Sequence, residues 1–208
     1  MDKLSVINYT EYENKLPQSG RHIIGSETDE GFIVYQAYRP SIAEFALENQ
    51  FFGGEFRLSR MSWVKPNFLW MMYRSGWASK AGQEHVLAIE IKKQAFFEIL
   101  DNAVNSSFDI SKYGNIDNWR KALSESSVRL QWDPDHDPKG KKLDRKAIQL
   151  GLKDEYLKHY SKDWILSIQD ISKFVKEQGE KVSRNLITEL QVIEEKVIDI
   201  PSEIREIW

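Results

Sequence analysis

The chain has 208 residues, of which 41% are hydrophobic and 12% aromatic, so it is long enough to bury the core of one domain. Its formal net charge of −3 gives no overall attraction to nucleic acid, which leaves a local basic groove as the only route to that class of ligand. Because it contains no cysteine, disulfide bonds, a thiolate nucleophile and cysteine-ligated metals are excluded.

The two ends of the chain are polar. Residues 1–20 show no basic segment followed by an apolar run, and no stretch of about 18 apolar residues occurs, so we expect no signal peptide, no membrane span and a cytoplasmic protein. We predict a flexible N-terminal arm over residues 1–20, an α+β core domain over 21–172 and a charged helical tail over 173–208, broken near Gly179.

The first predicted elements are a strand and a short helix. Gly31–Tyr38 is rich in β-branched and aromatic residues and is predicted to be a strand. Ser41 followed by Glu44 matches the capping-box pattern, which predicts a helix over residues 41–49.

The rest of the chain alternates between predicted strands and helices. Further strands are expected over residues 60–64, His85–Lys92, 128–132, 146–152 and 164–168, and further helices over 67–75, 94–103, 117–125 and 154–160. This order indicates an α+β fold with a mixed or antiparallel sheet flanked by helices.

Residues 61–77, MSWVKPNFLWMMYRSGW, combine large aromatic side chains with cations. On the predicted helix Trp70, Tyr73 and Arg74 share a face, and Lys65 precedes it. Such a face could stack on a base or a nicotinamide ring while a cation binds phosphate. An ordinary core with an amphipathic edge explains the same residues, and both interpretations stay open.

Polar side chains also occur near the ends of three predicted strands. Gln36, Tyr38 and Arg39 end the first strand, Gln131 ends residues 128–132, and Gln149 interrupts an aliphatic run. Side chains at strand ends commonly build sites, so we predict that these residues line a cleft. The alternative is that they are the solvated face of half-exposed strands.

The segment WDPDHDPKGKK is predicted to be a solvated, turn-rich loop. Its spacing of Asp133, Asp135 and Asp137 resembles the start of a calcium-binding loop, but Pro138 stands where that loop needs glycine. The four histidines are scattered without a triad pattern. We therefore expect no metal site.

Six segments in this order resemble the domain of unknown function 4291 family: RHIIG, IVYQAYRPSIAEFAL, MSWVKPNFLWMMYRSGW, QEHVLAIEI, VRLQWDPDHD and AIQLGL. The resemblance covers about residues 20–172. The layout of elements is also more distantly similar to the ADP-ribosyltransferase fold. That second resemblance implies a split β-sheet that binds NAD.

The ADP-ribosyltransferase resemblance also implies roles for particular residues. Gln36 or Tyr38 would contact the nicotinamide ribose or amide, and Tyr73 or Trp70 would stack on nicotinamide. Gln149 or Gln131 would stand where the fold has a glutamate. The pyrophosphate would be bound by cations, namely Arg39, Lys65 or Arg74.

Glutamine cannot act as a general base, which favours an acceptor that brings its own nucleophile, such as nucleic acid. We therefore expect an NAD-binding ADP-ribosyltransferase-like protein that transfers ADP-ribose to a macromolecule. The alternatives are a non-enzymatic nucleic-acid-binding module using the same aromatic and cationic cleft, and a protein-interaction domain whose C-terminal helices form the contact surface.

Overall fold

Two β-sheets form the centre of the computed structural model, which describes residues 4–207 and the side chains of residues 4–204. The first sheet has three antiparallel strands in the order β10 (Ile165–Asp170), β6 (His85–Lys92) and β4 (Gly31–Tyr38). The second is mixed. It contains β2 (Gly20–Arg21), β9 (Lys142–Leu152), β8 (Val128–His136) and β7 (Val104–Asn105), with β5 (Ser62–Val64) paired to β9. The fold is therefore mixed α+β.

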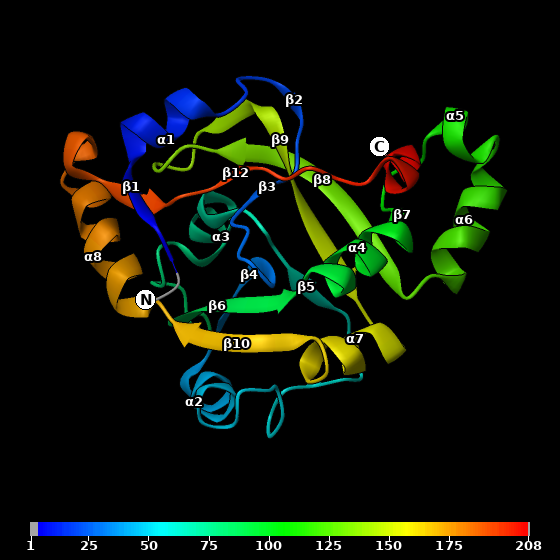
Figure 1. The fold of residues 1–208 in the computed structure, drawn as a ribbon, viewed down its shortest axis with the longest axis horizontal. Helices are drawn as coiled ribbons and strands as arrows, with labels where there is room; N and C mark the ends of the chain where they lie inside the picture. The colour runs from blue at the N-terminus through cyan, green and yellow to red at the C-terminus, as the bar shows by residue number, and fades with distance from the viewer. Residues whose placement is uncertain (1–3, 208) are drawn as a thin grey trace.

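Helices cover both faces of the three-stranded sheet and extend beyond its ends (Figure 1). Those that pack against it are α2 (Pro40–Asn49), α3 (Phe68–Ser75), α4 (Lys93–Asp101) and α8 (Ser172–Ser183). Helix α1 (Tyr9–Lys15) packs on the 3-10 turn η1 (Ile187–Glu189), α7 (Asp154–Ser161) packs on β9, and a second 3-10 turn, η2 (Ser202–Ile207), packs on α4. The pair α5 (Ile110–Tyr113) and α6 (Ile116–Glu125) projects at the end opposite α8 and buries no residue fully.

The three-stranded sheet is buried on both faces because β4 and β6 are almost continuously apolar. Phe32 and Val34 of β4 belong to one hydrophobic cluster, whereas Ile33 and Tyr35 belong to a second cluster on the opposite face. Successive side chains of a strand point to opposite faces, so an unbroken apolar run supplies both clusters.

Most predicted elements are confirmed, and β4 and β6 have the expected bounds. The predicted capping box is wrong. The N-cap of α2 is Arg39, Pro40 occupies the first turn, and the Ser41 hydroxyl donates instead to the Glu55 carboxylate at 2.6 Å. Proline is well suited to the first helical position, which moves the start of the helix one residue earlier.

The two ends of the chain differ from the prediction of a loose arm and a helical tail. Residues 6–8 form β1 (Val6–Asn8), which pairs with β11 (Gln191–Ile193), and β3 (Ile24–Gly25) pairs with β12 (Lys196–Val197). Residues 1–3 of the predicted arm and Trp208 of the predicted tail lie outside the described residues. The two ends thus cover each other, which neither local sequence reveals.

Helix α8 also packs on the core. It buries Phe174 and Val175, and it runs without interruption through Gly179, where a break was expected. A Cβ at Gly179 would lie 2.8 Å from the Cβ of Trp77, so this glycine allows α8 to approach the loop after α3.

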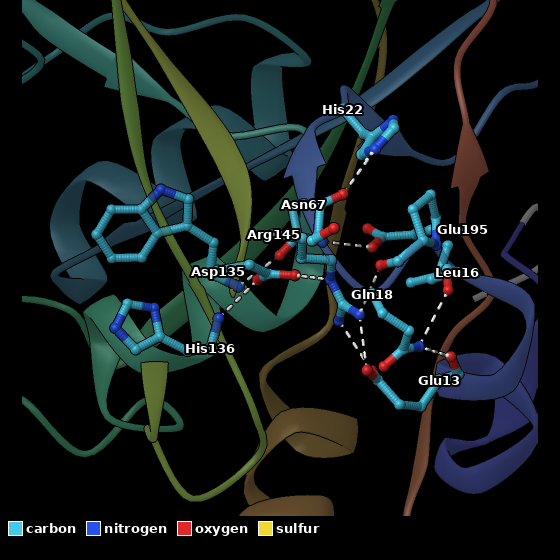
Figure 2. Close-up of polar contacts among 12 residues, drawn as sticks. Glu13, Leu16, Gln18, His22, Asn67, Asp135, His136, Arg145 and Glu195 are labelled. Carbon is cyan, nitrogen blue, oxygen red and sulfur yellow. Dashed lines mark hydrogen bonds and ion pairs between the residues drawn. The ribbon is translucent and has the colours of Figure 1, made fainter. Parts of the chain in front are cut away.

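Buried polar contacts hold both ends of the chain on the core (Figure 2). The Arg145 guanidinium, on β9, donates to Glu13 of α1 at 2.7 and 2.8 Å and to Asp135 of β8 at 2.5 Å. Nearby, the Glu195 carboxyl accepts from the Phe68 amide at 2.7 Å and from Asn67 at 3.1 Å. Burial raises the pKa of Glu195 well above its usual range.

No helix among the described residues has the length and apolar character needed to span a bilayer.

Candidate functional site

A polar cleft of about 530 Å³ opens where β4, β5, α3, β8 and β9 meet. Lys65 connects its two sides, because the Tyr35 amide of β4 donates to the Lys65 carbonyl at 2.7 Å just after β5. Six of the nine residues predicted for the site line this cleft: Gln36, Tyr38, Lys65, Arg74, Gln131 and Gln149. Roles assigned to them remain predictions, but their convergence is a property of the fold.

Lys65 is the most unusual side chain of the cleft. Only 4% of this residue is exposed, and its amine forms no hydrogen bond and no ion pair among the described residues. Its nearest aromatic contact is the Trp70 ring, whose centroid lies 5.7 Å from Nζ. Burial, reinforced by the positive charge of Arg74 and opposed by the negative charge of Asp133, lowers the pKa of Lys65 to about 8. A buried cation that forms no ion pair or hydrogen bond is costly, and a phosphate ligand would add to the partial compensation from Asp133.

Asp133 lies between the two predicted glutamines. Gln131 and Gln149 are directly opposed on β8 and β9, and their amide nitrogens donate to Asp133 Oδ1 at 2.9 Å and Oδ2 at 2.8 Å. Both glutamine nitrogens are thereby used, and each carbonyl oxygen remains able to accept a hydrogen bond.

The prediction that Asp133 belongs to a solvated loop is wrong, because β8 continues to His136. On a strand, residues two apart share a face, so Gln131 and Asp133 form a polar alternation that could have indicated the longer strand.

The amide of Gln36 is fully occupied. It donates to Ser62 Oγ at 2.9 Å and to the Trp63 carbonyl at 3.0 Å, and it accepts from the buried Tyr160 hydroxyl at 2.7 Å. Gln36 therefore holds β5 and α7 against β4 with these atoms. The Tyr38 hydroxyl lies beside the same serine, 3.4 Å from Ser62 Oγ.

Three predicted residues do not line the cleft. Trp70 is buried and Tyr73 is 41% exposed, and the Tyr73 ring stacks on His136 with centroids 3.6 Å apart. Helical geometry explains this difference: Met71 and Arg74, three residues apart, face the cleft, while Trp70 and Tyr73 face β8. Arg39 instead pairs with Glu55 at 2.6 Å beside a neighbouring cavity.

Two arginines near the cleft had no signal in the sequence analysis. Arg60 lines the cleft, and Arg57 lines the neighbouring cavity of about 470 Å³. Both lie in the irregular segment before β5, which has no periodicity to orient their side chains. The only pointer was the clustering of two cations in the short segment RLSR.

The aspartates after Trp132 do not gather around a common centre. Asp135 is buried against Arg145, and Asp137 accepts from the backbone amides of Lys139 and Lys141 at 2.9 Å each. Within residues 4–204, no three His, Asp or Glu side chains are arranged to hold a metal ion.

Comparison with known proteins identifies the family but no activity. Residues 22–202 match the family described as "Domain of unknown function (DUF4291)". None of the curated proteins matches the sequence.

Proposed function

The chain belongs to the DUF4291 family, whose description assigns no activity, and from its cleft we propose that it binds NAD and transfers ADP-ribose to a macromolecule. The observation that carries this proposal is the unpartnered, buried amine of Lys65 facing a polar cleft. Together with Arg74, it supplies the charge that a pyrophosphate needs, and binding of phosphate would neutralise positive charge that Asp133 offsets only in part.

The remaining lining residues suit the other parts of NAD. The half-buried Trp63 presents an aromatic surface in the cleft for a flat ring. The carbonyl oxygens of Gln131 and Gln149 can accept hydrogen bonds from a carboxamide or from ribose hydroxyls. Trp63 thus takes the stacking role that the sequence analysis assigned to Trp70 or Tyr73.

Asp133 supplies the carboxylate that the sequence analysis did not find. Cleavage of NAD breaks the bond between ribose C1′ and the nicotinamide nitrogen, and the electron pair of that bond leaves with nicotinamide. Asp133 does not itself line the cleft, but it accepts hydrogen bonds from the lining side chains of Gln131 and Gln149, which fix its two oxygens. A negative charge near the ribosyl cation favours this step. The acceptor nucleophile then forms a bond to C1′ and gives its proton to Asp133.

Thermal unfolding with and without NAD tests the binding step. At about a hundredfold excess over Kd, NAD should stabilise the protein by about 2.7 kcal/mol, which raises Tm by about 5–10 °C for a chain of this size. ATP should raise Tm less than NAD, because it has no nicotinamide ribose.

Lys65→Met should lose the NAD-induced rise in Tm, whereas Lys121→Ala, at an exposed position on α6, should retain it. An absent rise with NAD, or equal rises with NAD and ATP, would overturn the proposal.

A further inference from the structure

The cleft continues into a second cavity. The two share Ala37, Tyr38, Arg60 and Gln83, so they form one groove, which we call the basic groove. Its cationic lining residues are Arg39, Arg57, Arg60, Lys65 and Arg74. The groove is therefore longer than the cleft assigned to NAD, and its cations extend along both parts.

The positive charge of the basic groove is largely uncompensated. Its one acidic lining residue is Glu55, which already pairs with Arg39 and Ser41. No ion pair or side-chain hydrogen bond is formed by Arg57, Arg60 or Arg74 within the described part of the chain. Because the whole chain has a net charge of −3, this concentration of free guanidinium groups is a local feature.

NAD accounts for only part of this charge. The pyrophosphate of NAD bound as proposed would lie between Lys65 and Arg74, which leaves Arg57 and Arg39 beside the second cavity. Cations spaced along a groove beyond a bound pyrophosphate match a ligand with repeated phosphates. A different cavity, lined by Glu27, Asp29, Glu30 and Glu90, has the opposite charge, so a polyanion would favour the basic groove.

We propose that the basic groove binds single-stranded nucleic acid as the acceptor of ADP-ribose. This inference rests on the proposed function. A single strand is favoured over a duplex because an acceptor atom must enter the cleft, and a base inside a duplex must first leave its stack. A base nitrogen or a sugar hydroxyl oxygen then forms the bond to C1′ as nicotinamide departs, and its proton passes to Asp133.

Fluorescence anisotropy tests this inference. It measures how tightly a short, labelled, single-stranded oligonucleotide binds to the protein at a series of salt concentrations. The double variant Arg39→Ala, Arg57→Ala should bind more weakly. Its slope of log K against log salt should be shallower by about 0.7, which is the contribution of one phosphate contact on a single strand, because Arg57 is free while Arg39 is paired with Glu55.

A matched control removes two arginines elsewhere. Arg120 has an exposed acidic partner as Arg39 does, and Arg184 is an exposed arginine with no acidic partner among the described residues, so Arg120→Ala, Arg184→Ala should bind like the wild type. The NAD-induced rise in Tm should be retained by both double variants, because their arginines lie outside the NAD cleft.

Three results would overturn the inference: no oligonucleotide binding at low salt, equal binding of duplex or poly-glutamate, or an unchanged affinity in Arg39→Ala, Arg57→Ala. If any of these results is found and NAD still raises Tm, the proposed function stands and only the acceptor is wrong. If the oligonucleotide binds but NAD does not, the proposed transfer is wrong and the chain is a nucleic-acid-binding module.

Discussion

Arg145 donates two hydrogen bonds to the carboxylate of Glu13, across 132 positions of sequence, and thereby joins β9 to α1. A third bond from Arg145 reaches Asp135, which is fully buried. This network holds the N-terminal segment on the second sheet through contacts between residues that are far apart in the sequence.

Replacing Arg145 by methionine should therefore destabilise the protein strongly. The change leaves the buried carboxylate of Asp135 without its partner, for which we expect a loss of about 3–5 kcal/mol in the free energy of unfolding, measured in urea. Arg120→Ala, which removes an exposed ion pair with Asp117, should cost less than about 1 kcal/mol. Equal losses in the two variants would contradict the buried role of Arg145.

Lys65→Met should increase stability while abolishing NAD binding. Burial lowers the pKa of Lys65 to about 8, so the unfolded chain binds this proton more tightly than the native protein does. The resulting penalty is complete below pH 8 and disappears as pH rises toward 10.5. A shift of this size corresponds to about 3 kcal/mol at pH 7.

Urea unfolding of Lys65→Met and wild type at pH 7 and pH 10 measures this effect. The variant should be the more stable protein at pH 7, and its advantage should shrink at pH 10. A less stable variant at pH 7 would show that Lys65 has a stabilising partner.

His136 should make the protein sensitive to acid. Burial lowers the pKa of His136, although Asp133, Asp135 and Asp137 act in the opposite direction and Lys142 acts with burial. Neither ring nitrogen of His136 has a hydrogen-bond partner within the described residues. The neutral ring is therefore the native form, and its contribution to stability is complete above pH 6.5 and is lost as pH falls through the lowered native pKa.

His136→Phe keeps a ring against Tyr73 and removes this titration. The variant should lose less stability than the wild type between pH 8 and pH 5, as measured by urea unfolding at each pH. A His136→Phe profile that parallels the wild type would show that His136 does not drive the acid loss.

Gln36→Leu should lower the free energy of unfolding, because the Gln36 amide is a structural group. The substitution strands the Tyr160 hydroxyl, which is 0% exposed, and removes the bonds to Ser62 and Trp63. We expect a loss of about 1–3 kcal/mol for the unsatisfied buried group. Gln191→Leu, on the exposed side of β11, should change stability by less than about 0.5 kcal/mol. If Gln36→Leu were as stable as the wild type, the Gln36 side-chain amide would not be needed for folding and would be available to a ligand.

The centre of the fold could be predicted because its signals are local. β4 and β6 carry apolar runs of strand length, and both bounds agree with the sequence. The ends could not be predicted, because Val6 pairs with Ile193 and Tyr12 donates to Glu195, contacts that no local pattern specifies. The polar sequence of α1 is typical of a flexible arm, and only the contacts with the distant C-terminal segment show that it is packed.

The same distinction applies to the site. Gln131 and Gln149 were recognisable as polar interruptions of strands, and the register between β8 and β9 places them opposite each other. Asp133 was instead assigned to a solvated loop, because a segment containing Pro134 and three aspartates resembles a turn. Arg57 was missed because its position depends on the path of an irregular loop, which periodicity does not determine.

The most direct measurement of the central claim is the incubation of the protein with NAD and a single-stranded oligonucleotide, followed by quantification of free nicotinamide and the oligonucleotide mass. Nicotinamide release should match the gain of one ADP-ribosyl unit per modified strand. Asp133→Asn should slow both at least about a hundredfold while still binding NAD. Neither nicotinamide release nor a mass gain, in wild-type protein that binds both ligands, would contradict the claim that this cleft transfers ADP-ribose.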